Sequence, residues 1–270
     1  MLPLNQIESE ILAQVNTVLT DIDDTLTLNG RIPATAFMAM EKLQKAGIKV
    51  IPVTGRPAGW CDHIARMWPV DGIVGENGAF YFYYQAQQHK MIRRYWDSEA
   101  VRQKNRHRLS ALSDKILATV SGTKTSADQS YRETDLAIDF CEDVPPLPLG
   151  EVNRIVALFR QAGARAKVSS IHVNGWFGEY DKLAMTRILF QEIFNQELER
   201  RKQQVIFVGD SPNDVPMFRF FPHSVGVANI TQFTDQLSAQ PDWITEQAGG
   251  FGFAELVDRI LKAKELPLTK

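Results

Sequence analysis

The chain has 270 residues, of which 44% are hydrophobic and 23% are charged, and its formal net charge is −2. This composition excludes an intrinsically disordered chain, because disorder goes with fewer apolar residues and a larger net charge. The balance of 30 Lys and Arg against 32 Asp and Glu leaves no excess of positive charge for the phosphates of a nucleic acid. No apolar run approaches the roughly 20 residues of a membrane helix. Two cysteines, Cys61 and Cys141, exclude a disulfide scaffold and indicate a reducing compartment, so we expect a cytoplasmic protein that binds neither nucleic acid nor membrane.

The first part of the chain alternates short apolar runs with helical patterns. Residues 1–15 carry acids and no basic segment, so they predict a short amphipathic helix rather than a secretion signal. The strands and helices that follow alternate, which predicts a doubly wound parallel sheet. The predicted strands lie at residues 17–20, 48–53 and 72–74, and the predicted helices at residues 33–46 and 58–67.

The middle of the chain breaks this pattern. Residues 79–84 are rich in aromatic side chains and give way to a polar stretch. A long charged helix is predicted at 98–120. It is followed by a strand at 135–140, a helix at 151–161 and a second strand at 166–173. The parallel pattern then returns, with helices at 181–196, 214–221 and 253–264 and strands at 205–208 and 224–227. The sequence therefore predicts an α/β fold with a Rossmann-like core of residues 1–83 and 178–270, into which an α+β cap domain of residues 84–177 is inserted.

Three carboxylates stand within four positions at residues 21–25, which read Asp-Ile-Asp-Asp-Thr and follow the first long strand. Their mutual repulsion makes a purely structural role costly without a cation or strong donors. In sheets of this kind, ligands bind at the carboxyl ends of the strands. An acidic turn is the simpler alternative. A calcium loop of the EF-hand type does not fit, because Leu26 stands where that loop needs Gly and Ile32 where it needs a bidentate Glu.

A second acidic segment, residues 209–214 with the sequence Gly-Asp-Ser-Pro-Asn-Asp, also follows a buried strand. A helix start would explain its Ser, Pro and Asn, and that interpretation is compatible with a site. Because both acidic segments end parallel strands of one sheet, their oxygens should converge. Hard carboxylate oxygens suit Mg²⁺, which prefers one or two carboxylates together with water and substrate phosphate.

Two further features indicate an anion at the same edge of the sheet. Thr54, Gly55 and Arg56 follow another predicted strand and offer a hydroxyl, close backbone approach and a planar donor fork, although such a segment is also common in a simple turn. Lys182 stands at the start of a predicted helix, where the helix dipole disfavours a cation. A nearby anion or acid cluster would explain its placement.

Together these segments resemble the four motifs of haloacid dehalogenase superfamily phosphatases, and the resemblance covers the whole chain. The insert resembles the large α/β cap of the Cof-like subclass (subfamily IIB), and Asn77 and Gly78 resemble the Asn-Gly loop before that cap. Residues 209–214 resemble those of sugar-phosphate phosphatases, mannosyl-3-phosphoglycerate phosphatase among them. Asp24 and Leu183 depart from the pattern, which has Gly at both places. These departures bear on the subgroup and remove no catalytic atom.

The resemblance implies a Mg²⁺-dependent phosphatase that acts on a small phosphorylated metabolite, with a sugar phosphate expected. Asp21 would be the nucleophile, and Asp23 would be first the general acid and then the base. Mg²⁺ would be held by the Asp21 carboxylate, the Asp23 backbone carbonyl and Asp210, with Asp214 in support through water. The residues that would bind the phosphoryl group are Thr54, Lys182 and Asn213.

Four more residues are candidates for contact with the substrate or the cap: Arg56, Asn77, His172 and Asn174. A strand would place His172 and Asn174 on one face, near the return from the cap to the core, although the pattern alone favours an exposed polar strand. Hinges are expected near residues 83–88 and 175–178.

Other functions stay open at the level of the sequence. A phosphomutase of the same subclass and a non-catalytic sugar-phosphate-binding regulator are the alternatives. The regulator is disfavoured because Asp21, Asp23, Lys182 and Asp210 are all present. A dehalogenase is disfavoured because its chemistry needs neither Asp23 nor Mg²⁺. The sequence indicates no oligomeric state.

Overall fold

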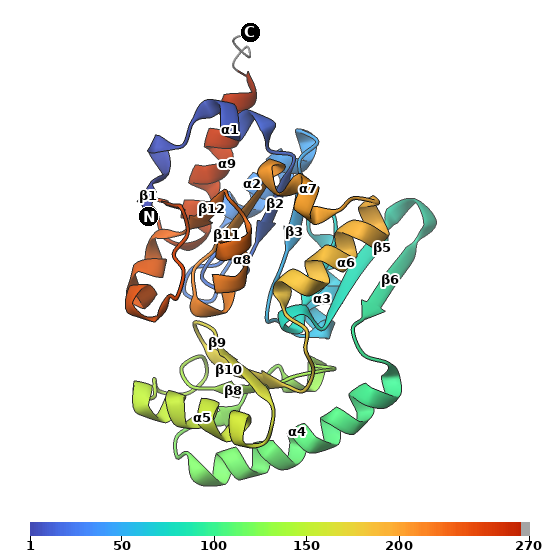
Figure 1. Ribbon diagram of the computed structural model, residues 1–270, viewed down its shortest axis with the longest axis vertical. Coiled ribbons are helices and arrows are strands. Elements are labelled where there is room, and N and C mark those ends of the chain that lie inside the picture. Colours follow the sequence, from blue (N-terminus) through green and yellow to red (C-terminus); the bar gives the residue numbers. More distant parts are fainter. Residues whose placement is uncertain (266–270) are drawn as a thin grey trace.

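The computed structural model describes residues 1–265, so the last five residues of the predicted second core segment, 266–270, lie outside the described residues. A six-stranded parallel sheet forms the centre of the core, in the order β1-β13-β12-β11-β2-β3 (Figure 1). Its strands are β1 (Leu2–Pro3), β2 (Thr17–Thr20), β3 (Lys49–Pro52), β11 (Val205–Gly209), β12 (Ser224–Gly226) and β13 (Trp243–Ile244). The strands predicted at 17–20, 48–53, 205–208 and 224–227 all lie in this sheet, which β1 at its edge and the neighbouring β13 extend. The strand predicted at 72–74 does not belong to it but to a second, antiparallel sheet.

Helices cover both faces of this sheet. One face packs against α1 (Ser9–Gln14), α2 (Ala34–Lys45), α3 (Ala58–Met67) and α9 (Gly249–Glu265). The other face packs against α6 (Lys182–Phe194), α7 (Leu198–Arg201) and α8 (Val215–Phe220). Successive residues of β2 show the two-sided burial, since Val18 belongs to the first cluster and Leu19 to the second. Such strands read as continuous apolar runs, which is why β2 and β11 are readily predicted.

An antiparallel sheet extends the core beyond β3. It consists of β4 (Ile73–Gly75), β5 (Phe80–Gln85) and β6 (Lys90–Tyr95), and a parallel bridge between Val53 and Val74 joins it to the main sheet. The cap boundary predicted at residue 84 therefore falls inside β5, and the polar stretch after it is the turn of a hairpin that stays on the core. The sequence does not predict strand β6, because its exposed residues are charged and its alternation of apolar and polar residues is weak. The hinge expected at 83–88 lies in this hairpin.

Residues 99–176 form a separate unit, which we call the cap. It contains α4 (Glu99–Thr119), β7 (Lys124–Thr125), β8 (Leu136–Asp139), α5 (Leu149–Gln161), β9 (Arg165–Val168) and β10 (His172–Trp176). Its antiparallel sheet has the order β7-β8-β10-β9, with α4 and α5 packed on one face and the other face turned toward the core (Figure 1). The chain crosses between core and cap at 96–98 and 177–181.

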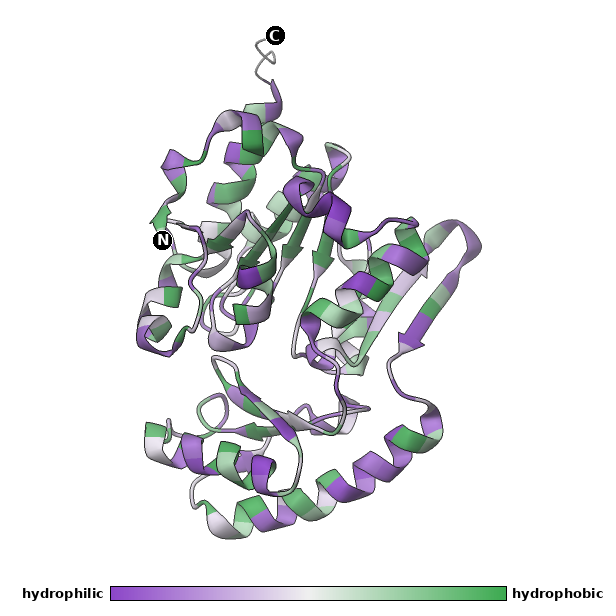
Figure 2. Cartoon of the chain, in the orientation of Figure 1, coloured by the Kyte–Doolittle hydropathy of each residue, from purple (hydrophilic) through white to green (hydrophobic). Residues whose placement is uncertain are grey.

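The single strand predicted at 166–173 is wrong, because the chain turns back within it and forms β9 and β10. The turn is made by Ser169, whose hydroxyl oxygen accepts hydrogen bonds from the backbone N–H groups of Ile171 and His172. Hydrophobic residues gather in the central strands, whereas the helices mix hydrophobic and hydrophilic residues along their length (Figure 2). Within residues 1–265, no helix is both long enough and apolar enough to cross a membrane.

Candidate active site

Three neighbouring strands deliver polar side chains to one edge of the core sheet. Asp21 directly follows β2, Asp210 directly follows β11, and Thr54 lies two residues after β3. The order β11-β2-β3 makes these strands adjacent and parallel, so their carboxyl ends meet under the cap. The structure thus brings together side chains that are up to 189 positions apart in the chain.

A cluster of three buried carboxylates lies at this edge. One oxygen atom from each of Asp21, Asp210 and Asp214 lies within 4.8 Å of the others. Lys182, the first residue of α6, reaches into the cluster, with Nζ 2.6 Å from Oδ1 of Asp21 and 2.7 Å from Oδ1 of Asp214. The acid cluster explains why a lysine stands at a helix start.

The cluster raises the proton affinity of its own members. Burial, opposed by Lys182 but reinforced by the charges of Asp214 and Asp23, raises the pKa of Asp21 to about 8. Burial and the charges of Asp21 and Asp214 also raise the pKa of Asp210 well above its ordinary value. The single positive charge of Lys182 therefore does not balance the negative charges of these carboxylates. A second cation would reduce the repulsion among them.

The residues of the cluster fit a divalent cation of the Mg²⁺ kind. Oδ2 of Asp214 is already engaged by the backbone N–H groups of Asp210 and Ser211, at 3.1 and 3.4 Å. Oδ1 of Asp210 accepts a hydrogen bond from Thr25, but its Oδ2 is buried without a hydrogen-bond partner within residues 1–265. A buried, unpartnered carboxylate oxygen beside two further carboxylates is a hard-oxygen donor set. Asp21 and Asp210 would hold the ion, and Asp214 would support them.

Asp214 also shapes the loop that carries Asp210 and Asn213. It closes a capping box with Ser211 at the start of η6 (Pro212–Asp214). Gly209 is required beneath it, because a Cβ atom there would collide with Oδ2 of Asp214. Asn213 is buried, and its Oδ1 accepts a hydrogen bond from the Ser211 hydroxyl. This loop therefore places Asn213 beside the acid cluster.

Thr54 and Asn77 occupy adjoining turns at the end of β3 and β4. Thr54 is fully buried, and its Oγ1 accepts a hydrogen bond from the backbone N–H of Arg56 at 3.0 Å. The backbone N–H of Asn77 donates to the Thr54 carbonyl oxygen at 3.0 Å. Asn77 adopts φ 57° and Gly78 adopts φ 103°, and a Cβ atom on Gly78 would collide with the Asp181 carbonyl. The Asn-Gly turn thus holds the Thr54 loop against the start of α6, where Lys182 lies.

Asp23 and Arg56 form a pair beside the cluster. Nε of Arg56 lies 2.9 and 3.0 Å from the two carboxylate oxygens of Asp23, and Asp23 lines the same small cavity as Asp21. Arg56 also reaches two acids of the cap, Asp128 at 3.2 Å and Glu142 at 2.8 Å. The sequence presents Arg56 as a donor for a phosphate or carboxylate, and in the structure three carboxylates of the protein engage it.

His172 and Asn174 both lie on the core-facing side of β10, and both are buried. Nε2 of His172 lies 2.8 Å from Oε2 of Glu142, and Nδ2 of Asn174 donates to Asp135 at 3.0 Å. Burial alone would raise the pKa of Glu142, but the close contact with His172 and the charge of Arg56 hold it at about 2. His172 and Asn174 line a cavity of about 10 Å³ together with Asp21 and Asn213. The alternative of an exposed polar strand is wrong.

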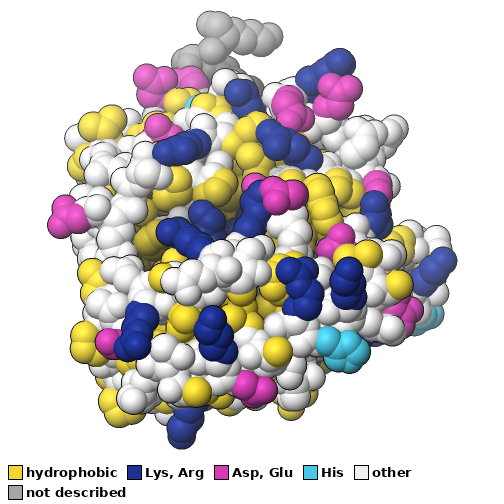
Figure 3. Space-filling model, turned by 60° about the horizontal axis from the view of Figure 1, so that its bottom comes forward, with side chains coloured by type: hydrophobic (Ala, Val, Ile, Leu, Met, Phe, Trp, Pro, Cys, Tyr) yellow, Lys and Arg dark blue, Asp and Glu magenta, His cyan; other side chains and the backbone are white. Residues whose placement is uncertain are grey.

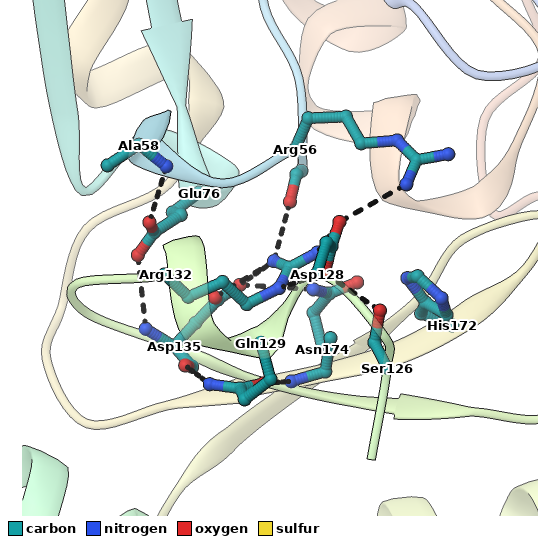
Figure 4. Close-up of polar contacts among 12 residues, drawn as sticks. Arg56, Ala58, Glu76, Ser126, Asp128, Gln129, Arg132, Asp135, His172 and Asn174 are labelled. Carbon is teal, nitrogen blue, oxygen red and sulfur yellow. Dashed lines mark hydrogen bonds and ion pairs between the residues drawn. The ribbon is translucent and has the colours of Figure 1, made fainter. Parts of the chain in front are cut away.

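A polar network fastens the cap to the core next to this cavity (Figure 4). Glu76 of the core accepts hydrogen bonds from the backbone N–H groups of residues 133–135 of the cap, at 2.9, 2.6 and 3.2 Å. Arg132 of the cap donates to the Gly55 carbonyl oxygen at 2.8 Å and pairs with Asp128 and Asp135. Burial and the charge of Asp135 raise the pKa of Glu76 to about 7, against the effect of Arg132 and the N–H donors.

Sequence reasoning missed this network. The residues that it omitted are Glu76, Asp128, Arg132, Asp135 and Glu142. Glu76 directly precedes the Asn-Gly turn, and this position is the one weak indication in the sequence that Glu76 belongs to the site. The cap residues carry no recognisable spacing, and their partners are set only by how the cap sits on the core.

The role of Lys182 in balancing the cluster can be measured on the folded protein. We expect Lys182→Met to lower the free energy of unfolding by roughly 3–5 kcal/mol, because it leaves buried carboxylates without their cation. Urea unfolding in EDTA measures this loss, and adding Mg²⁺ should recover part of it. The control is Lys42→Met, which removes an exposed pair with Asp258. A loss below about 1 kcal/mol for Lys182→Met would contradict the electrostatic role.

Comparison with known proteins agrees with this geometry. The family model of haloacid dehalogenase-like hydrolases matches residues 18–123 and 190–255. Phosphoglycolate phosphatase 1 of Saccharolobus solfataricus is 27% identical over 254 residues, covering 93% of this chain and 97% of that protein. A solved structure from Thermoplasma acidophilum has a TM-score of 0.68 at 18% identity and covers 92% of this chain and 98% of its own. A sugar phosphatase of subclass IIB has a TM-score of 0.59 at 16% identity, over 93% of this chain and 98% of its own. The chain belongs to the haloacid dehalogenase-like hydrolases.

Proposed function

We propose that this protein is a Mg²⁺-dependent phosphatase that hydrolyses a small phosphorylated metabolite through an aspartyl-phosphate intermediate. The observation that carries the proposal is the convergence, at the ends of β11, β2 and β3, of Asp210, Asp21 and Thr54 with Lys182. Phosphoryl transfer depends mainly on positioning and on neutralising charge, and this set of residues supplies both.

Asp21 is the nucleophile in this proposal. Lys182 contacts its Oδ1, which leaves Oδ2 to attack phosphorus as the bond from phosphorus to the leaving oxygen breaks. Thr54, Lys182 and Asn213 would bind the phosphoryl oxygens. When bound, Mg²⁺ supplies positive charge that reduces the repulsion between the Asp21 carboxylate and an anionic phosphate.

Asp23 gives its proton to the leaving oxygen in the first step. In the second step it takes a proton from a water molecule, which attacks phosphorus and breaks the bond to Asp21, so that inorganic phosphate and the free carboxylate result. Arg56 fixes the position of the Asp23 carboxylate. The cap loop at 169–171 lines the cavity above these residues and would exclude bulk water.

Small phosphorylated metabolites are the substrate class that the comparisons support. The relatives are named phosphoglycolate phosphatases, and neighbouring structures include a sugar phosphatase and a sucrose-phosphatase. A sugar phosphate is our expectation. The test is a phosphate-release screen with Mg²⁺ over sugar, polyol, short-acid and nucleotide phosphates. Release from small esters supports the proposal, whereas formation of an isomer without phosphate release would indicate a mutase, and binding without any reaction would indicate a regulator.

The cap should discriminate among substrates. We expect His172→Ala to lower kcat/KM for sugar phosphates by about 10-fold, because a polar contact to the substrate is lost, and to change it little for p-nitrophenyl phosphate. Steady-state kinetics on both substrate types measures the split. The control is His107→Ala, on the exposed face of α4. Equal losses on every substrate would place His172 in catalysis or folding instead.

A further inference from the structure

The core-facing side of the cap sheet carries basic residues beside the catalytic cavity. In the antiparallel pairing of β9 and β10, Lys167 stands opposite Asn174 and Arg165 opposite Trp176. Residues directly opposite each other on antiparallel strands point to the same face. Because Asn174 lines the catalytic cavity, Lys167 and Arg165 face the core next to it.

These basic residues line a cavity that begins at the catalytic residues. Its volume is about 370 Å³, and its lining includes Lys182 and Asn213 from the core and Arg160, Arg165 and Lys167 from the cap. Asn213 also lines the small cavity around Asp21, so the two spaces adjoin. Cavities of this size hold small metabolites. A ligand phosphate at Asp21 would thus have its remaining atoms within reach of the basic side chains.

The same surface continues outward as a basic groove. A second cavity of about 890 Å³ is lined by Arg160, Lys167 and Arg219, and no acidic residue within 1–265 lines it. Figure 3 turns the molecule so that the cap comes forward, and it shows basic side chains around a hollow in this face. Asp181 is the acid of the inner cavity, and its Oδ1 is engaged as the cap of α6 by the N–H of Ala184.

The positive charges in this region are poorly compensated. Arg165 pairs with Glu179, but within residues 1–265 no carboxylate lies within 4.0 Å of the charged nitrogens of Lys167 or Arg160. Partial burial lowers the pKa of Lys167. The charge of Asp181 raises this pKa, and the charges of Arg165, Arg160 and Arg219 lower it further. These side chains are exposed, so water screens part of the repulsion among them, and an anion bound between them would relieve the rest.

We propose that this cavity binds a second anionic group of the substrate, a carboxylate or a phosphate, through Lys167 and Arg160. The inference rests on the proposed phosphatase function and narrows its substrate class to phosphate monoesters with a second negative charge. Lysine and arginine bind both anions through charge-assisted hydrogen bonds. The core would bind the phosphate to be cleaved, and the cap would bind the second anionic group.

The test uses pairs of esters that differ only in the second charge. Phosphoglycerate and glycerol phosphate form one pair, and fructose bisphosphate and fructose 6-phosphate form the other; together they distinguish a carboxylate from a phosphate. The wild-type protein should show a higher kcat/KM on the doubly charged member of at least one pair. Lys167→Gln and Arg160→Gln should each reduce that value about 10-fold or more and leave the singly charged member within about 2-fold. The matched control is Lys115→Gln, on the exposed face of α4, which should change neither.

A binding measurement separates this inference from the proposed function. Calorimetric titration of the Asp21→Asn protein with phosphoglycerate and with glycerol phosphate reports affinity without turnover. If no ester is hydrolysed, the phosphatase proposal fails, yet tighter binding of phosphoglycerate that Lys167→Gln removes would still support the anion site. Equal kcat/KM and equal affinity within each pair would overturn the inference. So would a preference for aryl esters, which would point instead to the 490 Å³ cavity lined by Trp60 and Tyr131 beside Asp23.

Discussion

Replacing Asp21 by asparagine should leave the protein folded and reduce its turnover of phosphate esters by at least about 10⁴-fold. The amide keeps an oxygen for the Lys182 hydrogen bond at Oδ1, so the packing around the acid cluster is retained. It cannot attack phosphorus, however, so no aspartyl-phosphate forms. Burial and neighbouring carboxylates raise the pKa of Asp21, and a neutral side chain at this place should therefore not destabilise the fold. Phosphate release and thermal unfolding measure the two effects.

Asp258→Asn is the matched control for this change, because Asp258 lies on α9 and forms an exposed pair with Lys42 of α2. It should turn over substrate at the wild-type rate. Turnover by Asp21→Asn within about 10-fold of wild type would show that another group attacks phosphorus, and unfolding of the variant would show that its inactivity has a structural cause.

Removal of the divalent cation should abolish activity, and Mg²⁺ should restore it. The observations behind this prediction are the buried, unpartnered Oδ2 of Asp210 and the crowding of three carboxylates. Ca²⁺ should bind yet inhibit, because its larger and looser coordination shell misplaces the nucleophile. Activity in EDTA, in Mg²⁺ and in Ca²⁺ provides the first measurement.

Asp210→Asn gives a second readout that does not depend on activity. Mg²⁺ should raise the thermal midpoint of the wild-type protein, because a ligand that binds only the folded state stabilises it. In EDTA, Asp210→Asn should unfold at a higher temperature than wild type, since one of the repelling carboxylates is gone. The Mg²⁺-induced rise should then be small or absent. Full activity in EDTA, or an unchanged Mg²⁺ shift in Asp210→Asn, would contradict the metal assignment.

The core of the fold and the strand-end residues could be predicted because their signals are local. Parallel strands buried on both faces read as apolar runs, and β2 and β11 each lead directly into their acids. β2 and β3 are consecutive strands of the core sheet and lie side by side, as consecutive strands usually do, whereas the place of β11 beside β2 is known only from the structure. Asp21, Asp210 and Lys182 therefore come together in the structure although they are distant in the chain.

The features that could not be predicted depend on tertiary placement. Strand β6 pairs with β5, but its exposed and charged residues hide its apolar pattern, so the sequence predicts a cap boundary at residue 84, inside β5. The β9–β10 hairpin turns at Ser169 within a stretch that reads as one strand. Arg56 pairs with Asp128 and Glu142, which lie 72 and 86 positions further along the chain. The spacing of residues in the sequence does not predict such pairs.

Detection of a phosphoryl group on Asp21 is the most direct test of the proposed chemistry. Asp23→Asn lacks the base for the second step, so the intermediate should accumulate when this variant is mixed with Mg²⁺ and a good substrate and then quenched in acid. Mass spectrometry of the digested protein should find a mass gain of one phosphoryl group on the peptide that contains Asp21, and no gain in Asp21→Asn/Asp23→Asn. A phosphoryl group on any other residue, or wild-type hydrolysis with no phosphorylated peptide in the Asp23→Asn protein, would contradict nucleophilic catalysis by Asp21.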